Sequence, residues 1–299
     1  MEYHKPVLLN ESIDGMNISN NEVCVDVTFG GGGHSKEILK RLGDGGRLFG
    51  FDQDKDAVVN SLSDDRFTLV KQNFRYLKNF LKFHQATPVD CVLADLGVSS
   101  HQFNEGERGF SIRFEGPLDM RMNQGGDLTA EKIVNDYTES ELIRIFKEYG
   151  EVRNSQKLAF EIVSTRDSGR ITKTIELIAI IEDCVPGKFR NKYLAQVFQA
   201  LRIEVNDEMG ALKDMLEQSY EVLKPGGRLS VITYHSLEDR LVKNFFKKGK
   251  FEGEIEKDFF GNPQLKFKQI TRKPILPTDE EIKINNRARS AKLRVGEKL

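Results

Sequence analysis

Three strand-like runs near the start of the chain carry an acidic residue at or near their carboxyl ends. The first of them is also followed by glycines. Residues 22–28 (EVCVDVT) contain Asp26 and run into four consecutive glycines followed by His34. Residues 47–52 (RLFGFD) end at Asp52, and residues 89–95 (VDCVLAD) end at Asp95. Parallel sheets bind their ligands at the carboxyl ends of strands, near the point where the strand order reverses. The three acids and the glycines are therefore predicted to share one ligand site.

The chemistry of this predicted site favours S-adenosylmethionine over a nicotinamide dinucleotide. Glycines let the backbone approach a ligand closely, and Asp52 could accept both hydroxyls of a ribose, with a helix cap as the alternative. The dinucleotide pattern G-x-G-x-x-G is incomplete, and Asp26 would repel a pyrophosphate. No G-x-x-x-x-G-K-[ST] segment occurs either, which argues against a nucleoside triphosphate. S-adenosylmethionine carries a sulfonium and an ammonium but no phosphate, so it suits an acidic loop.

The residues around these acids are predicted to form a parallel sheet. Predicted strands at 22–28, 47–52, 67–71 and 89–95 alternate with predicted helices at 35–42, 54–62 and 74–83, as right-handed β–α–β units require. A Lys-Pro-Gly-Gly turn precedes another strand at 228–233, which is followed by a helix at 237–248. Two more strand candidates lie at 265–271 and 291–295.

A helical segment interrupts this alternation. Residues 96–127 show no strand pattern, and the periodicity is helical from residue 129 to about residue 206. Thr138 and Glu141 have the spacing of a capping box, and helices are predicted at 156–165, 174–183 and 193–223, with a break near Asn206. The predicted architecture is α/β: a class I (Rossmann-like) sheet domain of residues 1–107 and 199–299, with an inserted all-helical domain of residues 108–198.

Charge is distributed unevenly along the chain. The 299 residues carry a net charge of -1, but residues 240–299 hold 16 Lys and Arg against 8 Asp and Glu. This basic segment fits a polyanionic partner, with a solvated tail as the alternative. Cys24, Cys91 and Cys184 are predicted to be reduced thiols, which fits a cytoplasmic protein. No membrane span, signal peptide or metal site is predicted.

The order of these features is the general pattern of class I methyltransferases. An acidic strand end, a glycine loop and an acid after the second strand are followed by an aromatic residue, Phe74, after the third strand. Phe74 is a candidate for stacking on an adenine ring, with core packing as the alternative. The Pro-Gly-Gly turn before the late strand completes the pattern.

Further motifs make a resemblance to one family specific. They are residues 4–9 (HKPVLL), 28–35 (TFGGGGHS), 95–102 (DLGVSSHQ), 107–111 (ERGFS), 116–122 (GPLDMRM), 198–206 (FQALRIEVN), 235–240 (HSLEDR) and 287–290 (RARS). Over nearly the whole chain, they resemble the bacterial small-subunit (16S) ribosomal RNA cytosine-N4 methyltransferases. Tyr234 departs from the family's usual Phe, and residues 192–196 (KYLAQ) depart from its common His-Pro-Ala form.

The resemblance implies an enzyme that methylates N4 of a specific cytidine in the ribosomal decoding centre. It implies S-adenosylmethionine as cofactor and small-subunit ribosomal RNA, or the 30S particle, as partner. The cofactor-binding residues that it carries over are Gly32, Gly33, His34, Asp52, Phe74, Asp95 and Gln102. No metal is expected, and the oligomeric state is left open.

Methylation of a cytosine amine requires a proton acceptor, because the nitrogen lone pair is delocalised into the ring. Asp95 is the first candidate for this catalytic role, with cofactor contact alone as the alternative. His235 and Ser236, which follow the late strand, are further catalytic candidates. The alternative for these two is that Ser236 caps the next helix and that His235 bonds to the backbone.

The base has to leave its helix or be single-stranded before it can react. Arg108, Phe110, Arg121 and Met122 are predicted to line its pocket, with loop packing as the alternative. The cations predicted to meet phosphates are Lys243, Lys247, Lys248, Arg287, Arg289, Lys292 and Arg294. Two other functions stay open: a small-molecule methyltransferase, which would not need the basic segment, and a non-catalytic RNA-binding or assembly factor.

Overall fold

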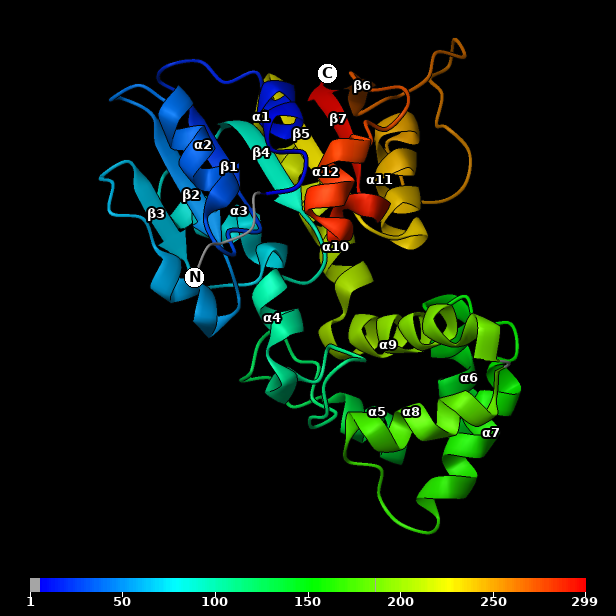
Figure 1. The fold of residues 1–299 in the computed structure, drawn as a ribbon. Coiled ribbons are helices and arrows are strands. Elements are labelled where there is room, and N and C mark those ends of the chain that lie inside the picture. The colour runs from blue at the N-terminus through cyan, green and yellow to red at the C-terminus, as the bar shows by residue number, and fades with distance from the viewer. Residues whose placement is uncertain (1–5, 186) are drawn as a thin grey trace. The chain divides into compact units, whose positions relative to one another are not determined.

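The computed structural model describes residues 6–185 and 187–299, and only the backbone of Ser100. His4 and Lys5 of the first motif lie outside these residues. The chain divides into a sheet unit, Met1–Gly97 with Met209–Leu299, and a helical unit, Val98–Glu208 (Figure 1). None of the helices described is both long enough and apolar enough to cross a membrane.

The sheet unit is built on seven strands in the order β3-β2-β1-β4-β5-β7-β6 (Figure 1). Their bounds are β1 Val23–Asp26, β2 Arg47–Phe51, β3 Phe67–Val70, β4 Val89–Asp95, β5 Leu223–Thr233, β6 Phe267–Gln269 and β7 Lys292–Lys298. The first five strands are parallel, and β7 runs antiparallel to both β5 and β6. The strand order reverses between β1 and β4, where the predicted ligand site lies. The predicted α/β fold class is confirmed.

Both faces of this sheet are covered by helices. These are α1 Leu9–Met16, α2 Gly33–Arg41, α3 Leu77–Phe83, α10 Glu208–Val222, α11 Ser236–Lys248 and α12 Asp279–Ile284, with short 3-10 turns at Lys55–Asn60, Phe74–Tyr76 and Asn286–Ser290. Successive side chains of a strand point to opposite faces. Val25 and Phe49 therefore join one core cluster with α3, α10 and α11, whereas Cys24 and Leu48 join another with α1 and α2.

Some elements differ from the sequence prediction. The helix expected at 54–62 is a 3-10 turn, which Asp54 caps by accepting a hydrogen bond from the Asp56 N–H at 3.1 Å. The expected turn at 224–227 is a bulge within β5, because Leu223 pairs with Val89 whereas Arg228 pairs with Cys91. Helices α1 and α12 were not predicted, since each is short and carries few apolar residues.

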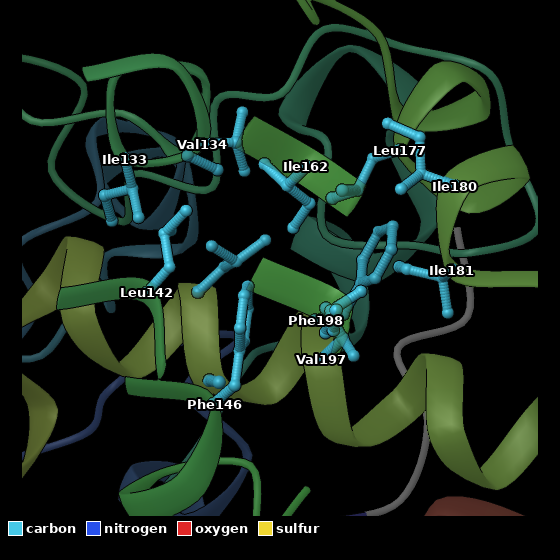
Figure 2. Close-up of a cluster of buried hydrophobic side chains, with 14 of the residues drawn as sticks. Ile133, Val134, Leu142, Phe146, Ile162, Leu177, Ile180, Ile181, Val197 and Phe198 are labelled. Carbon is cyan, nitrogen blue, oxygen red and sulfur yellow. The ribbon is translucent and has the colours of Figure 1, made fainter. Parts of the chain in front are cut away.

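The helical unit has a core of its own. Its elements are α4 Ser100–Asn104, α5 Ala130–Asp136, α6 Glu139–Glu148, α7 Ser155–Arg166, α8 Thr174–Asp183 and α9 Arg190–Asn206, with 3-10 turns at Gly106–Arg108 and Gly187–Phe189. Leu142 and Phe146 of α6 meet Ile162 of α7, Leu177 of α8 and Val197 of α9 in this core (Figure 2). The predicted capping box of Thr138 and Glu141 is present at the start of α6.

The bounds of the helical unit differ from the predicted 108–198. Helix α9 continues without a break to Asn206, and its Phe198 and Leu201 are buried in the helical core. On the other side, Val98 and Phe103 pack against the same core. The chain then breaks at Asp207, whose φ of 45° is left-handed. The unit is therefore ten residues longer at each end than the predicted domain of residues 108–198.

Candidate active site

A glycine turn between β1 and α2 forms the first part of the site. Gly30 and Gly32 have φ values of 51° and 72°, a left-handed conformation in which other residues are strained. A Cβ on Gly33 would lie 2.3 Å from the Pro6 Cγ, so only glycine lets the start of α2 pass so close to this segment. The turn itself therefore contributes backbone and no side chains at Gly30, Gly32 and Gly33.

The Asp26 carboxylate is bound by its own loop. Its Oδ1 accepts from the Thr28 N–H at 3.1 Å, and its Oδ2 accepts from the Ser35 hydroxyl at 2.7 Å. The side chain is buried, and burial raises its pKa although the bonds from Ser35 and Thr28 oppose the rise. Asp26 thus joins the end of β1 to the first turn of α2.

Asp52 joins the ends of β1 and β2. Its Oδ2 accepts from the Gly30 N–H at 2.8 Å, and its Oδ1 accepts from the Asp54 N–H at 2.8 Å. Burial raises the Asp52 pKa to about 6, while the two N–H donors act in the opposite direction. Because each carboxylate oxygen has more than one acceptor position, Asp52 can still receive hydroxyl donors from a ligand.

Asp95 lies at the end of β4, on the other side of the glycine turn. Its Oδ1 accepts from the Tyr234 hydroxyl at 2.8 Å, and its Oδ2 lies 3.8 Å from the His34 Nδ1. The Asp95 N–H donates to the Thr28 hydroxyl at 2.6 Å, which ties β4 to the same turn. Burial raises the Asp95 pKa to about 6, although His34 and then Tyr234 act to lower it.

The ring of His34 is buried beside Asp95. Its Nε2 lies 3.2 Å from the Val7 carbonyl oxygen, so a proton on Nε2 would be bonded there. Burial lowers the His34 pKa, and the nearby Asp95 only partly opposes this. A neutral ring protonated at Nε2 would turn the unprotonated Nδ1 toward Asp95.

Phe74 follows the end of β3 at the same edge of the sheet. The Asp52 N–H donates to the Val70 carbonyl at 3.1 Å, so the ends of β2 and β3 lie together. Phe74 is half-buried, and it packs against the core cluster beneath α3 and α10. Core packing thus explains the burial of part of the Phe74 ring, and stacking of this ring on an adenine stays a prediction.

Gln102 belongs to the helical unit. Its side chain accepts from the Ser99 N–H at 3.0 Å, and its own N–H donates to the Ser99 hydroxyl at 3.2 Å. These bonds make a capping box for α4. Contact of Gln102 with the cofactor stays a prediction.

His235, rather than Ser236, caps helix α11. The His235 Nδ1 accepts from the Glu238 N–H at 3.5 Å, and its Nε2 lies 3.1 Å from the Glu238 Oε1. Glu238 is buried, and its Oε2 accepts from the Tyr234 N–H at 2.8 Å. Ser236 is exposed. These contacts give His235 a structural role, and catalysis by either residue stays a prediction.

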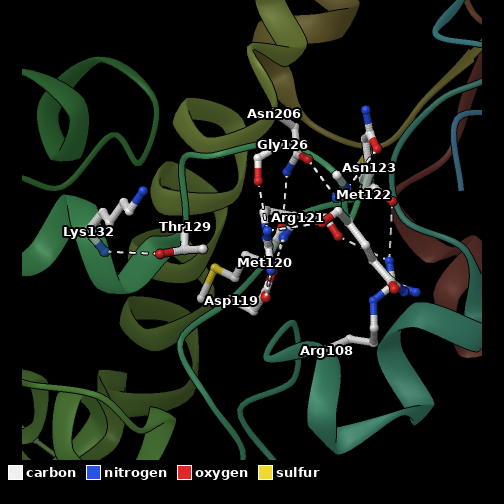
Figure 3. Close-up of polar contacts among 12 residues, drawn as sticks. Arg108, Asp119, Met120, Arg121, Met122, Asn123, Gly126, Thr129, Lys132 and Asn206 are labelled. Carbon is white, nitrogen blue, oxygen red and sulfur yellow. Dashed lines mark hydrogen bonds and ion pairs between the residues drawn. The ribbon is translucent and has the colours of Figure 1, made fainter.

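The residues predicted to line a base pocket hold a loop of the helical unit together. Figure 3 shows Arg108 and Asn206 reaching the backbone of Met122. Arg108 is buried and also donates to the Arg121 carbonyl at 3.0 Å. The Arg121 guanidinium donates two hydrogen bonds to Asp119, at 2.6 and 2.9 Å. Phe110 lies in the helical core. These contacts support the loop-packing alternative.

The predicted phosphate contacts divide into two groups. Lys243, Lys247, Arg287 and Arg289 are exposed, whereas Lys248 is half-buried and donates to the Gly253 carbonyl at 2.9 Å. Arg294 is buried, and its Nε lies 2.6 Å from Asp239. Lys292 lies 3.5 Å from the same carboxylate. The prediction is therefore wrong for Arg294, which joins β7 to α11.

Sequence reasoning missed the role of Tyr234 in this site. The sequence marked it only as a departure from the resembled family, because nothing in the local pattern relates residue 234 to residue 95. The pairing of β4 with β5 brings the two together, since Asp95 lies opposite Ile232. Its position directly after the late strand was the only available signal.

The described residues of this edge fit S-adenosylmethionine. Asp52 and Asp95 are half-buried carboxylates at two strand ends, and the turn between them exposes backbone. Such a set suits ribose hydroxyls and a positively charged ligand better than a pyrophosphate, which prefers basic groups or unbonded N–H donors. The fold and the site together define a doubly wound α/β protein with a site suited to a ligand that contains a nucleoside.

The chain belongs to the MraW methylase family, whose model matches residues 1–299. Ribosomal RNA small subunit methyltransferase H of Flavobacterium johnsoniae is 60% identical over 299 residues, covering 100% of this chain and 99% of that protein. The protein of that name from Bacteroides thetaiotaomicron is 58% identical over 298 residues, covering 100% of this chain and 98% of that protein.

Among solved structures, an rRNA methylase from Streptococcus thermophilus is similar with a TM-score of 0.44 and 12% identity, covering 100% of this chain and 99% of that chain. Membership of the methylase family confirms the predicted family, the methyltransferase class and S-adenosylmethionine as cofactor. The roles of individual residues rest on the contacts and distances described for this site, and they stay proposals.

Proposed function

We propose that this enzyme methylates N4 of a specific cytidine in the decoding centre of small-subunit ribosomal RNA. Methyl transfer to this RNA is supported by the name of relatives that are 56–60% identical to the chain. The proposal that the methyl acceptor is an amine rests on Asp95, whose carboxyl group is held at a strand end beside the glycine turn.

Asp95 is proposed as the proton acceptor. When bound, S-adenosylmethionine supplies an electrophilic methyl carbon and leaves as a neutral thioether. An ionised Asp95 accepts a hydrogen bond from the N4–H group, which orients the nitrogen lone pair and later takes the proton. A carboxyl pKa near 6 keeps Asp95 mostly ionised at neutral pH and still basic enough for this transfer.

Asp52 and the glycine turn are proposed to position the nucleoside part of the cofactor. Asp52 would accept ribose hydroxyls, and the backbone at Gly32 and Gly33 would approach the ligand closely. Phe74 would meet the adenine from the end of β3. Exact placement matters here, because an attack on a methyl carbon requires the nitrogen opposite the sulfur at roughly 3 to 3.5 Å.

Exposed cations of the sheet unit are proposed to bind the RNA backbone, namely Lys243, Lys247, Arg287 and Arg289. Such contacts are independent of sequence and sensitive to salt. We assign the choice of base to the helical unit, Val98–Glu208. In the sequence, this unit lies between β5 and β4, the strand that ends at Asp95. The proposed ribosomal substrate also supports a cytoplasmic location for the enzyme.

Methyl transfer to isolated small subunits tests this proposal. Particles that lack the modification are incubated with the enzyme and labelled S-adenosylmethionine, and the digested RNA is separated into nucleosides. We expect label only in N4-methylcytidine, at one position, with no label in particles already modified there. Label in another nucleoside, or in small molecules alone, would contradict the proposed substrate.

The role of Asp95 is tested in the same assay with Asp95→Asn. We expect turnover to fall by more than about 100-fold while cofactor affinity changes far less, because the lost interaction acts mainly in the transition state. Binding of RNA and cofactor without any turnover by the wild-type enzyme would instead favour a non-catalytic RNA-binding factor. Equal losses of cofactor affinity and catalytic efficiency in the variant would make Asp95 a binding residue.

A further inference from the structure

The Tyr234 hydroxyl touches the proposed acceptor directly. Its oxygen donates to the Asp95 Oδ1 at 2.8 Å, which is a normal length for a bond from a hydroxyl to a carboxylate. Tyr234 follows β5 and Asp95 ends β4, so the contact spans 139 residues of chain and exists only in the folded sheet. A bond to a charged group is worth more than one between neutral groups.

The backbone and the ring of Tyr234 are both held in place, so its hydroxyl has little freedom to leave this position. Its N–H donates to Glu238 at 2.8 Å, which fixes the backbone at the start of α11. A Cβ on Gly97 would lie 3.5 Å from its ring, and the ring packs against a core cluster that includes Ile232 and Leu293. Order that is already present in the protein costs nothing during the reaction.

We propose that Tyr234 is a positioning residue for the proposed methyl transfer: its hydroxyl holds Oδ1 of an ionised Asp95, so that Oδ2 is the oxygen that takes the amine proton. This inference rests on the proposed role of Asp95. It explains how a carboxyl group at a largely buried strand end stays charged near neutral pH.

Several other groups face this pair, and they decide the direction of its titration. A protonated His34 on α2 would favour the charged form of Asp95, but burial lowers the His34 pKa and so weakens this effect. Asp26 on β1 and Glu238 on α11 disfavour the charged form. Tyr234 itself faces Asp95, Glu238 and Glu281, and burial raises its pKa well above the usual value. Tyr234 therefore stays protonated and donates throughout the working pH range.

Removing the hydroxyl has a predictable sign. A hydrogen bond to the charged form lowers a carboxyl pKa, so Tyr234→Phe should raise the pKa of Asp95 by about one unit. The phenyl ring keeps the packing, so the fold should be retained. If the bond between Tyr234 and Asp95 served only the stability of the fold, Tyr234→Phe would also remove the bond. The pH dependence of turnover would then stay unchanged.

The first measurement is independent of activity. Carbon-13 NMR of aspartate carboxyl groups, with the Asp95 signal assigned by its loss in Asp95→Asn, gives the midpoint of the Asp95 titration. The second is the pH profile of turnover at saturating cofactor and ribosomal particles. Tyr137→Phe is the matched control, because the Tyr137 hydroxyl donates to a carboxylate, Glu204, at 3.0 Å in the helical unit.

We expect Tyr234→Phe to raise both the NMR midpoint and the acidic limb of turnover by about one pH unit, with about two-fold lower turnover at pH 7. We expect Tyr137→Phe to move neither. An unchanged NMR midpoint in Tyr234→Phe would overturn the inference while leaving Asp95 as acceptor. A raised midpoint with an unshifted turnover profile would overturn the acceptor role of Asp95, and with it the positioning role of Tyr234.

Discussion

The three aspartates at the edge of the sheet are bound in different ways. Asp26 is surrounded by donors from its own loop and from Ser35, so it shapes the turn. Asp52 accepts two backbone N–H bonds and has acceptor positions left for a ligand. Asp95 accepts one bond, from Tyr234, among the contacts of the described residues. The same residue type therefore has a structural role, a proposed binding role and a proposed catalytic role.

Asp52 should determine cofactor affinity. We expect Asp52→Ala to weaken S-adenosylmethionine binding by about 1 to 3 kcal/mol, because hydrogen bonds to a charged acceptor are lost. Isothermal titration calorimetry gives the dissociation constants. The exposed Asp44 on the α2–β2 turn provides the control, and Asp44→Ala should leave the affinity unchanged. An unchanged affinity in Asp52→Ala, or tight binding of NAD, would contradict the assignment.

Asp95 should lower stability at neutral pH. Its folded pKa of about 6 exceeds the unfolded value of 3.8, so the folded state holds its proton more tightly. The wild type consequently gains stability as the pH falls from about 6 toward 4, and ionised Asp95 is unfavourable above that window. We expect Asp95→Asn to be more stable by about 1 to 3 kcal/mol at pH 7.5, with the gain shrinking at pH 5.

Chemical unfolding at the two pH values measures this difference. Asp64→Asn is a control of opposite sign, because Arg66 lowers the pKa of Asp64 to about 2. That variant should gain no stability at pH 7.5. If Asp95→Asn were less stable than the wild type at pH 7.5, the carboxylate would contribute more to the fold than its burial costs.

At the scale of elements, the loop before α5 depends on two close backbone crossings. A Cβ on Gly109 would lie 2.2 Å from the Pro117 carbonyl oxygen, and one on Gly116 would lie 2.1 Å from the Gly106 carbonyl oxygen. Gly109 also has a φ of 70°. Asn206 fixes the same loop by donating to the Met120 carbonyl at 2.8 Å. Glycine is thus required here by contact with backbone, which cannot move aside as a side chain can.

We expect Gly109→Ala to destabilise the protein by about 2 to 4 kcal/mol, because strain at a positive φ is added to the clash. Gly169→Ala is the control, since nothing lies within 4 Å of the Cβ position at Gly169. Thermal unfolding of both variants gives the comparison. Equal stability of the two would show that the loop can rearrange without cost.

At the scale of the molecule, each unit buries its own core. The core residues of the helical unit all come from the continuous segment Val98–Glu208. Those of the sheet unit come from the two flanking segments. A continuous segment with a closed core meets the main requirement for independent folding.

Residues 98–208 expressed alone should therefore fold. We expect a helical circular dichroism spectrum and cooperative thermal unfolding. The shorter segment 108–198 is the matched control: it lacks Val98 and Phe103 and also the buried Leu201, so it should be markedly less stable. A disordered longer segment, or equal stability of the two, would show that these bounds do not delimit a folding unit.

RNA affinity should depend on salt through the exposed arginines of the sheet unit. We expect the double variant Arg287→Ala, Arg289→Ala to reduce the slope of log affinity against log salt by about 1.4 to 1.8, because two phosphate contacts are lost. Filter binding at several salt concentrations measures this slope. Arg294→Ala should instead destabilise the fold, since it removes the nearer of the two cations, Arg294 and Lys292, that face the Asp239 carboxylate. A wild-type slope in the double variant would mean that these charges are only solvated.

The sequence alone determined the elements, the family resemblance and most of the residues at the sheet edge. Short apolar runs that alternate with helical segments identified β1 to β4, and glycine and acid positions identified the turn, Asp52 and Asp95, since these signals are local. The helix cap at Thr138 could also be predicted from the sequence, because a capping box spans only four residues.

Tertiary structure alone decided which distant residues meet. Strand pairing brought Tyr234 to Asp95 and placed Cys24 opposite Cys91, although each pair is far apart in the sequence. The packing of α11 against β7 paired Arg294 with Asp239, and this ion pair removed a predicted RNA contact. The physical reason is common to all three: residue type and periodicity report how a segment folds locally, whereas a side chain's partner, burial and pKa depend on which other segments pack against it.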